Sequence, residues 1–223
     1  MNDFNQNGYV ILPQAIDIKS IDLLKQEISR YTKDKMAYGI RDLHSKISSV
    51  YNLATSDVIK NILDEHKTEL EFKLIKAIFF NKNLQQNWAV PWHQDKTIAV
   101  KQKVAISGYK NWTVKQGVTH VQPPLNILNK ITTIRIALDD TDSNNGALKI
   151  IPRSHKLGVL NQKQLNCVVQ QESALSCSLK TGDILMMHPL ILHSSNKSIN
   201  NKARRTIHLE YSNVSLPQNL AWS

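Results

Sequence analysis

Residues 131–151 read ITTIRIALDDTDSNNGALKII, and this stretch decides the class of the fold. Residues 131–138 are rich in β-branched side chains, which is typical of a strand. Residues 139–146 combine Asp, Asn and Gly, which favour turns because they hydrogen-bond locally or adopt positive φ angles. Residues 147–151 are again apolar and end at Pro152. The stretch therefore predicts two short strands that are separated by a turn.

Similar short apolar segments occur on both sides of this stretch. Strands are predicted at residues 8–12, 72–80, 90–95, 184–187, 191–194 and 205–211. Two helical patterns are predicted at residues 17–30, with Asp17 as N-cap, and at residues 56–66, with Ser56 as N-cap. The second helix is expected to bury Val58, Ile59, Ile62 and Leu63. Helices followed by many short strands predict a mainly β fold with flanking α elements, a double-stranded β-helix (cupin-like jelly roll) with N-terminal helices.

Three segments lack a clear periodicity of apolar residues. Residues 38–43 are expected to form a loop, and residues 153–180 are expected to be largely irregular. Residues 99–130 contain several Gly and Pro residues and predict a long connection with room for one short hairpin. Long connections in compact domains often serve function, so residues 99–130 are a candidate lid or substrate loop. The length of 223 residues favours one domain, residues 1–223.

Composition narrows the function classes. The chain has 28 Lys and Arg residues against 18 Asp and Glu residues, a formal net charge of +10, but the basic residues are scattered. We therefore expect no nucleic-acid partner, and a basic nucleic-acid-binding module is an alternative that rests on net charge alone. No apolar run approaches the roughly 20 residues that span a bilayer, and no secretory signal is visible. Cys167 and Cys177 are then expected to be free thiols in the cytoplasm.

A candidate metal site is formed by His93 and Asp95, which lie two residues apart, together with His193. In an extended strand, residues i and i+2 point to the same face, so His93 and Asp95 can reach one metal. Two imidazoles and one carboxylate form the facial triad that holds non-haem Fe(II). This triad leaves coordination positions open for a co-substrate and dioxygen. The competing interpretation is a coincidence of spacing.

Two arginines follow the third candidate ligand. A guanidinium binds a carboxylate through two parallel hydrogen bonds, so either arginine could hold a co-substrate carboxylate. Arg204 and Thr206 share one face of the predicted strand and could form a clamp, whereas Arg205 points to the opposite face. A bulge before the strand would exchange the two arginines, and the choice between them stays open.

Several motifs occur in the order that is found in a known family. They are Gly8-Tyr9-Val10, Trp92-His93-Gln94-Asp95, Asn145-Gly146-Ala147-Leu148, Ile151-Pro152-Arg153-Ser154-His155, Gly182-Asp183, His188-Pro189-Leu190-Ile191-Leu192-His193-Ser194-Ser195 and Arg204-Arg205. Through these motifs the chain resembles the phytanoyl-CoA dioxygenase family of Fe(II)/2-oxoglutarate-dependent oxygenases over nearly its whole length. The resemblance implies a jelly-roll barrel, which agrees with the strand pattern.

The resemblance also implies roles for individual residues. The implied iron ligands are His93, Asp95 and His193. Together with Thr206, the candidate contacts to the co-substrate 2-oxoglutarate are Arg204, Ser195, Lys82, Gln94 and Arg135. Arg204 would pair with the distal carboxylate, and Arg135 occupies an inward position where some relatives carry tryptophan. For Lys82 the alternative is a solvated strand end.

The leading hypothesis is an Fe(II)- and 2-oxoglutarate-dependent dioxygenase that hydroxylates an unactivated C–H bond of a small-molecule substrate. The resemblance implies Fe(II), 2-oxoglutarate and O2 as cofactors, with release of succinate and CO2. Related halogenases lack the carboxylate ligand, so Asp95 disfavours halogenation. The alternative is a non-catalytic jelly-roll protein that binds a metal or a small ligand.

Basic residues near the predicted lid motivate a further hypothesis, an anionic substrate. They are Lys101, Lys103, Lys110, Lys115 and His120. For His120, a substrate contact and a structural role both stay open. The remaining histidines are expected to have no metal role; they are His44, His66, His155 and His208. The odd separation of His188 from His193 predicts that His188 points away from the site.

Overall fold

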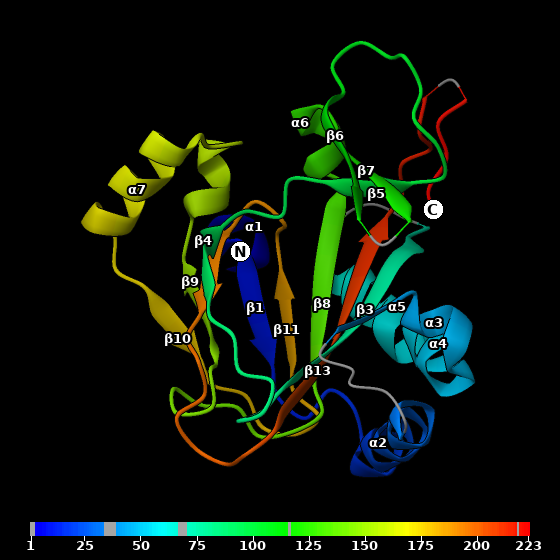
Figure 1. Cartoon of the computed structure of the whole chain (residues 1–223), viewed down its shortest axis with the longest axis vertical. Helices are drawn as coiled ribbons and strands as arrows, with labels where there is room; N and C mark the ends of the chain where they lie inside the picture. Colours follow the sequence, from blue (N-terminus) through cyan, green and yellow to red (C-terminus); the bar gives the residue numbers. More distant parts are fainter. Residues whose placement is uncertain (1–2, 34–38, 67–70, 116, 218) are drawn as a thin grey trace.

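The computed structural model describes residues 3–33, 39–66, 71–115, 117–217 and 219–223. Two antiparallel sheets form the body of the molecule, and a third, smaller sheet stands at one end (Figure 1). The largest sheet has the order β1 (Tyr9–Leu12), β11 (Ile184–Met187), β8 (Ile131–Ala137), β13 (Arg204–Ser212), β3 (Lys73–Lys82) and β2 (Gly39–Arg41). The second sheet has the order β10 (Leu175–Cys177), β9 (Leu148–Ile151), β12 (Leu192–Ser195) and β4 (Val90–His93). The predicted jelly roll is confirmed.

Every residue of β8 is buried, and strand alternation divides them between two environments. Ile134 and Ile136 point to the outer face of the large sheet, where they join the main hydrophobic core. Arg135 points the other way and lines a cavity between the two sheets. The facing sheets also share a smaller apolar cluster, to which Ala137 and Leu185 contribute from one sheet and Ile150 from the other.

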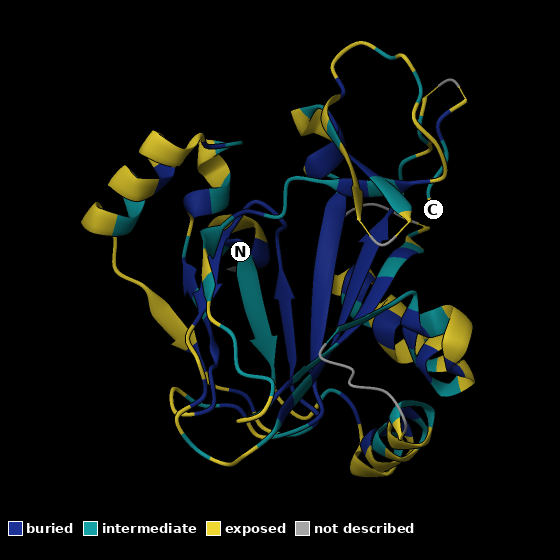
Figure 2. Cartoon of the chain, in the orientation of Figure 1, coloured by how far each residue is buried: buried dark blue, intermediate teal, exposed yellow. Residues whose placement is uncertain are grey.

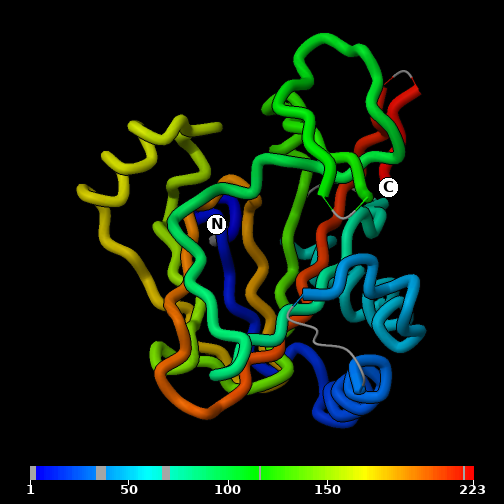
Figure 3. The backbone as a smooth tube through the Cα atoms, in the orientation of Figure 1, coloured from blue at the N-terminus to red at the C-terminus, as the bar shows by residue number. Residues whose placement is uncertain are grey.

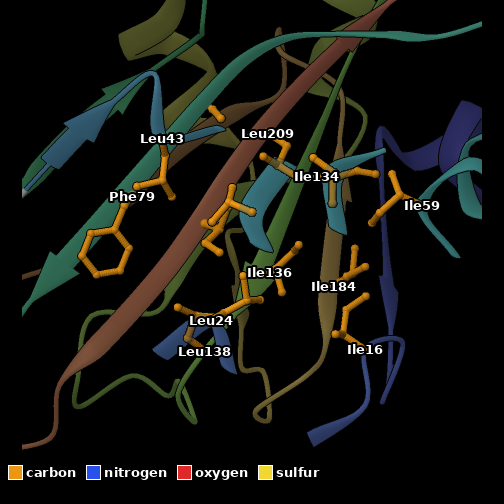
Figure 4. Close-up of a cluster of buried hydrophobic side chains, with 14 of the residues drawn as sticks. Ile16, Leu24, Leu43, Ile59, Phe79, Ile134, Ile136, Leu138, Ile184 and Leu209 are labelled. Carbon is orange, nitrogen blue, oxygen red and sulfur yellow. The ribbon is translucent and has the colours of Figure 1, made fainter. Parts of the chain in front are cut away.

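Helices cover the outer face of the large sheet (Figures 1 and 2). They are α1 (Asp3–Asn7), α2 (Ile18–Thr32), α3 (Leu43–Lys46), α4 (Ser48–Ala54) and α5 (Asp57–His66). The Asp17 side chain caps α2 as predicted, because its carboxylate accepts from the backbone N–H of Ser20 at 3.0 Å. Figure 4 shows Leu24 and Ile59 of these helices with Ile136 and Leu209 of the sheet. Burying each such side chain contributes about 1.5–3 kcal/mol.

The predictions for two irregular segments, and for the buried face of the second helix, were partly wrong. Residues 39–41 form β2 rather than a loop, because their backbone pairs with β3; residue 38 lies outside the described residues. Residues 153–180 contain a 3-10 turn (Ser154–Leu157), α7 (Gln162–Gln171) and β10. Asn161 and Gln164 form a capping box that starts α7. In α5, Val58 is exposed and the buried residues are Ile59 and Leu63.

Residues 99–130 are a folded substructure rather than a loose loop. They contain most of β5 (Ile98–Val100), the hairpin of β6 (Lys110–Lys115) and β7 (Val118–Gln122), and the short helix α6 (Leu125–Leu128). The third sheet has the order β5-β7-β6 and rests beside the C-terminal segment, where Val100 forms a bridge with Trp222 (Figure 3). The expected hairpin is confirmed. Among the described residues, no helix has both the length and the hydrophobicity of a membrane span.

Candidate metal centre and its cavity

The three candidate ligands lie together at one edge of the second sheet. His193 in β12 is the register partner of His93 in β4, and the ring centroids are 4.1 Å apart. Asp95 lies just beyond β4, where its backbone N–H donates to the carbonyl of Pro189 at 2.9 Å. The Asp95 carboxylate lies 3.8 Å from His93 Nε2 and 3.6 Å from His193 Nε2. These ligand atoms all lie within 4.8 Å of one another, so one metal ion can contact all three.

Both histidines present the same ring nitrogen to this point. His93 Nδ1 lies 2.9 Å from the carbonyl oxygen of Pro91, and His193 Nδ1 lies 2.9 Å from that of Ile191. Because a carbonyl oxygen only accepts, each Nδ1 carries the proton and each Nε2 keeps a lone pair for a metal. Burial lowers the pKa of His193 to about 4, so this imidazole is neutral at neutral pH. The donor set therefore fits Fe(II).

The carboxylate ligand is also in the form that a metal needs. Burial alone would raise the pKa of Asp95, but the neighbouring His193, His208 and His93 side chains together lower it well below its usual range. Asp95 is therefore ionised at neutral pH. Its side chain is about one-third exposed, so the ligand position opens into the cavity.

A second group of possible ligands combines Asp95 with His208 and Glu210 of β13. The Lys76 Nζ donates to the two Glu210 oxygens at 2.7 and 2.8 Å. His208 Nε2 lies 3.0 Å from Glu210 Oε1. These partners occupy the lone pairs that a metal would use, so this group is a buried ion-pair network. The expectation of no metal role for His208 is consistent with this geometry, although His208 does line the cavity.

Arg204 lies at the other end of the β3–β13 ladder from Lys76 and Glu210, and it is the register partner of Lys82. Its side chain is 4% exposed, its Nε has no hydrogen-bond partner, and no carboxylate of the described residues pairs with it. Burial, with a smaller contribution from Arg135, lowers the pKa of Arg204 to about 9, so the guanidinium stays charged at neutral pH. A buried charge without a counterion is costly, and a ligand carboxylate would remove that cost.

The open choice between the two arginines has a structural answer. Arg205 donates from Nε and Nη2 to the two oxygens of Asp139 at 2.8 and 2.7 Å. Its carboxylate partner is therefore internal, and Arg205 does not line the cavity. Thr206 shares the Arg204 face and is buried, but it is not part of the cavity wall. The geometry favours Arg204 as the clamp.

Lys82 and Ser195 lie next to Arg204. Lys82 is fully buried and its Nζ donates to Ser195 Oγ at 2.9 Å and to the carbonyl of Asn196 at 2.7 Å, so the solvated alternative is wrong. Burial lowers the pKa of Lys82 to about 7, with smaller effects from the two arginines. Gly146 is required here, because its φ is +80° and a Cβ would lie 2.7 Å from the Asn196 carbonyl.

Gln94, a candidate co-substrate contact, is not among the residues that line the cavity. Its side-chain nitrogen donates to the carbonyls of Gly158 and Leu190, both at 2.8 Å, and its oxygen accepts from the Leu160 N–H at 2.9 Å. The residue between the two ligands points away from them because side chains alternate along a strand. Gln94 therefore holds the neighbouring loops in place.

The third sheet contributes two residues to the cavity wall. His120 and Lys115 line the cavity, but Lys101, Lys103 and Lys110 do not. Sequence reasoning missed Arg41 of β2 and Lys76 of β3, which also line it. Strand alternation could have identified His208 and Glu210 as cavity residues. Each lies an even number of residues from Arg204 along β13 and therefore points to the same face.

His188 lies outside the cavity as predicted and packs against His155, with ring centroids 5.1 Å apart.

The fold and the site define a class. A mainly β jelly roll holds two histidines and one carboxylate in the arrangement of a non-haem metal centre, and a charged, unpaired arginine lies in the same cavity. The chain belongs to the phytanoyl-CoA dioxygenase (PhyH) family, whose model matches residues 4–206. A phytanoyl-CoA dioxygenase domain-containing protein 1 homolog from Caenorhabditis briggsae is 19% identical, with 99% of this chain and 91% of that protein covered.

Solved structures share the fold at low sequence identity. The epimerase SnoN from nogalamycin biosynthesis, in complex with Fe3+, alpha ketoglutarate and nogalamycin RO, superposes with a TM-score of 0.74 at 14% identity. That match covers 98% of this chain and 89% of SnoN. EctD from S. alaskensis, with 2-oxoglutarate and 5-hydroxyectoine, gives a TM-score of 0.73 at 17% identity and covers 94% of this chain and 73% of EctD.

Proposed function

We propose that this member of the family is an Fe(II)- and 2-oxoglutarate-dependent dioxygenase that hydroxylates a C–H bond of a small molecule. One observation carries the proposal: the metal triad and the unpaired Arg204 guanidinium line the same cavity. The similarity to proteins whose structures contain iron and 2-oxoglutarate supports the same choice of cofactors. We further propose that residues 1–223 act as one oxygenase domain in the cytoplasm; the free Cys167 and Cys177 fit a reducing compartment.

His93, His193 and Asp95 would hold the iron through two Nε2 atoms and one carboxylate oxygen. When bound, Fe(II) would chelate 2-oxoglutarate and activate dioxygen, which supplies the oxidant and leaves succinate and CO2. The protein keeps both imidazoles oriented through Nδ1–H bonds to the Pro91 and Ile191 carbonyls. The ligands therefore need little reorganisation when the metal binds.

Arg204 would bind the distal carboxylate of 2-oxoglutarate through its fork of N–H donors. Ser195 would assist, because its oxygen already accepts from Lys82 and its own proton is left to donate to a carboxylate. Lys82 would position Ser195 and add positive charge near the same carboxylate. The sheet of β5, β6 and β7 would limit water at the mouth, since His120 and Lys115 line the cavity from that side.

An anaerobic titration tests this function. We expect a weak visible absorption band that appears only when Fe(II) and 2-oxoglutarate are both present with the protein. The Asp95→Ala variant should lose this band and the substrate-independent turnover of 2-oxoglutarate. Retention of turnover at the rate of the unaltered protein would contradict the ligand assignment. Binding of one metal ion without the band would instead support a non-catalytic binding protein.

Hydroxylation is the finer part of the proposal, and it has its own test. Asp95 supplies a carboxylate at the position that a halide would need, so the triad favours oxygen transfer to carbon. In 18O2, the product of a turned-over substrate should gain one labelled oxygen while succinate gains the other. A product without oxygen gain, such as an epimer or a ring-closed compound, would leave the oxygenase class intact but refute hydroxylation.

A further inference from the structure

The cavity holds a second buried arginine that the proposed co-substrate does not require. Arg135 is 8% exposed and lines the cavity wall. Its one hydrogen bond within the described part of the chain joins Nη1 to His208 Nδ1 at 3.1 Å, and no carboxylate there lies within salt-bridge distance of it. A guanidinium has five N–H donors, so most of them remain available to a ligand. Like Arg204, Arg135 therefore has no carboxylate partner among the described residues, although unlike Arg204 it is anchored by a histidine.

Arg135 is held in place by a chain of polar contacts. An arginine only donates, so His208 Nδ1 accepts from Arg135, and the His208 proton lies on Nε2. Nε2 in turn donates to Glu210 Oε1 at 3.0 Å, and Lys76 donates to both oxygens of that carboxylate. The guanidinium also lies over the Phe80 ring, 5.7 Å from its centroid. Arg135 is therefore pre-organised, which reduces the entropic cost of ligand binding.

Register separates this arginine from the co-substrate clamp. Arg135 is the β8 partner of His208, which lies four residues along β13 from Arg204. That separation is roughly 13 Å between backbone positions along the strand, although the two guanidinium charges lie close enough for Arg135 to lower the pKa of Arg204. The distal carboxylate of 2-oxoglutarate would be taken by Arg204, and its other carboxylate by the metal. No acidic group of the co-substrate is then left for Arg135.

The charge balance of the cavity supports the same conclusion. The cationic side chains in its wall are Arg41, Lys76, Lys115, Arg135 and Arg204, against the two carboxylates of Asp95 and Glu210. The two positive charges of Fe(II) and the two negative charges of 2-oxoglutarate cancel each other. The loaded cavity would thus keep an excess of positive charge, which an anionic ligand would compensate.

We propose that Arg135 binds an acidic group, a carboxylate or a phosphate, of the primary substrate, so that this oxygenase selects anionic small molecules. The proposal rests on the proposed function, because it assigns the space that remains beside Fe(II) and 2-oxoglutarate. Arg41 and Lys115 add positive charge at the cavity wall. Glu210 and His208 act as positioning residues, since they reach the substrate only through Arg135.

A matched set of ligands tests the proposal without a known substrate. The protein is loaded with Fe(II) and 2-oxoglutarate under anaerobic conditions, the visible band is recorded, and hexanoate, hexyl phosphate or hexanamide is titrated by calorimetry. We expect at least one of the two acids to bind about tenfold or more tightly than the amide, because only an anion pairs with Arg135. The two acids separate carboxylate from phosphate selectivity. Bound 2-oxoglutarate blocks Arg204 during the titration.

The Arg135→Met variant provides the second measurement. It should lose most of the preference for the acid over the amide and show the same affinity for 2-oxoglutarate as the unaltered protein. Equal binding of acid and amide by the unaltered protein, no binding of either acid, or displacement of 2-oxoglutarate by the acids would overturn the proposal. A loss of 2-oxoglutarate affinity in Arg135→Met would assign Arg135 to the co-substrate instead. Absence of the visible band at the loading step would count against the proposed function rather than against this inference.

Discussion

The two ends of the β3–β13 ladder contain similar charged residues in opposite states. At one end, Lys76 and Glu210 face each other and form a buried ion pair with an N–O distance of 2.7 Å. At the other end, Arg204 and Lys82 face each other without a carboxylate of the described residues. The first end satisfies its own charges. At the second, Arg204 has no carboxylate partner, and Lys82, with a pKa of about 7, donates to Ser195 Oγ and the Asn196 carbonyl. If Arg204 binds the co-substrate as proposed, local pairing rather than residue type separates structural from ligand-binding charge in this fold.

The comparison of the two ends also predicts which substitutions should change stability and which should change ligand binding. A satisfied buried pair is costly to break, because removal of one partner leaves the other charge without compensation. An unsatisfied buried cation already carries that cost in the absence of ligand, so its removal should affect stability little or favourably. Substitutions at the two ends should therefore have different effects, and their sizes can be measured.

The largest effect on stability is expected from Glu210→Gln. The neutral amide leaves the largely buried Lys76 ammonium, whose side chain is 14% exposed, without a counterion and directs an N–H donor toward either Lys76 or His208. We expect the free energy of unfolding to fall by about 3–5 kcal/mol. Urea denaturation of the metal-free protein measures this change.

A double variant serves as the control for this prediction. Replacing both partners by apolar residues in Lys76→Met/Glu210→Leu removes the stranded charge and should recover most of the lost stability. If Glu210→Gln costs as little as a surface substitution, the ion pair does not stabilise this end, and the proposed contrast between the two ends fails.

The second-largest effect is expected on the binding of 2-oxoglutarate, at the Arg204 end of the ladder. Arg204→Met should raise the Kd for 2-oxoglutarate about a hundredfold, because a buried charge-assisted pair is lost. The stability of the metal-free protein should stay the same or increase, since an uncompensated charge is removed. Anaerobic titration of the visible band measures the Kd.

Arg205→Met is the matched control, because it changes the adjacent residue on the other face of β13. It breaks the pair with Asp139 and should reduce stability while leaving the Kd for 2-oxoglutarate unchanged. The reverse pattern, with binding lost only in Arg205→Met, would show that Arg205 and not Arg204 is the clamp.

Much of the fold and the ligand triad could be predicted from local patterns. The triad depends on a two-residue spacing and on one strand pairing, and both follow from alternation. Strand β2 and helix α7 were harder to predict. Helix α7 has one fully buried residue, Leu165, so its apolar period is weak, and its capping box at Asn161 was the usable signal.

The ion pair of Lys76 and Glu210 at the cavity wall could not be predicted, because it joins residues that are distant in sequence. Lys76 and Glu210 are 134 residues apart, and nothing in the sequence near either one indicates the other. The choice between Arg204 and Arg205 depended on strand register, which a single-residue shift would have reversed. The pairing of Arg205 with Asp139 supports the proposal that Arg204 is the clamp.

A smaller effect is expected from pH at Lys82. Its pKa falls from 10.5 in the unfolded chain to about 7 in the folded protein, so the unfolded chain binds more protons between these values. Stability of the metal-free protein should therefore rise as pH increases from about 7 to about 10, and Lys82→Met should reduce this rise. Urea denaturation at several pH values measures both proteins. Parallel curves would show that Lys82 is not desolvated as the structure indicates.

The smallest effect is expected from an exposed pair that resembles the buried one. Lys180 lies 3.0 Å from Asp140, nearly the separation of Lys76 and Glu210, but both side chains are more than half exposed. Water screens this pair, and Asp140 keeps its bonds from the Thr181 N–H and hydroxyl when Lys180 is removed. Lys180→Met should thus leave the urea midpoint unchanged. A loss comparable with that of Glu210→Gln would mean that distance rather than burial determines the value of these pairs, and the two ends of the ladder would have to be compared by geometry alone.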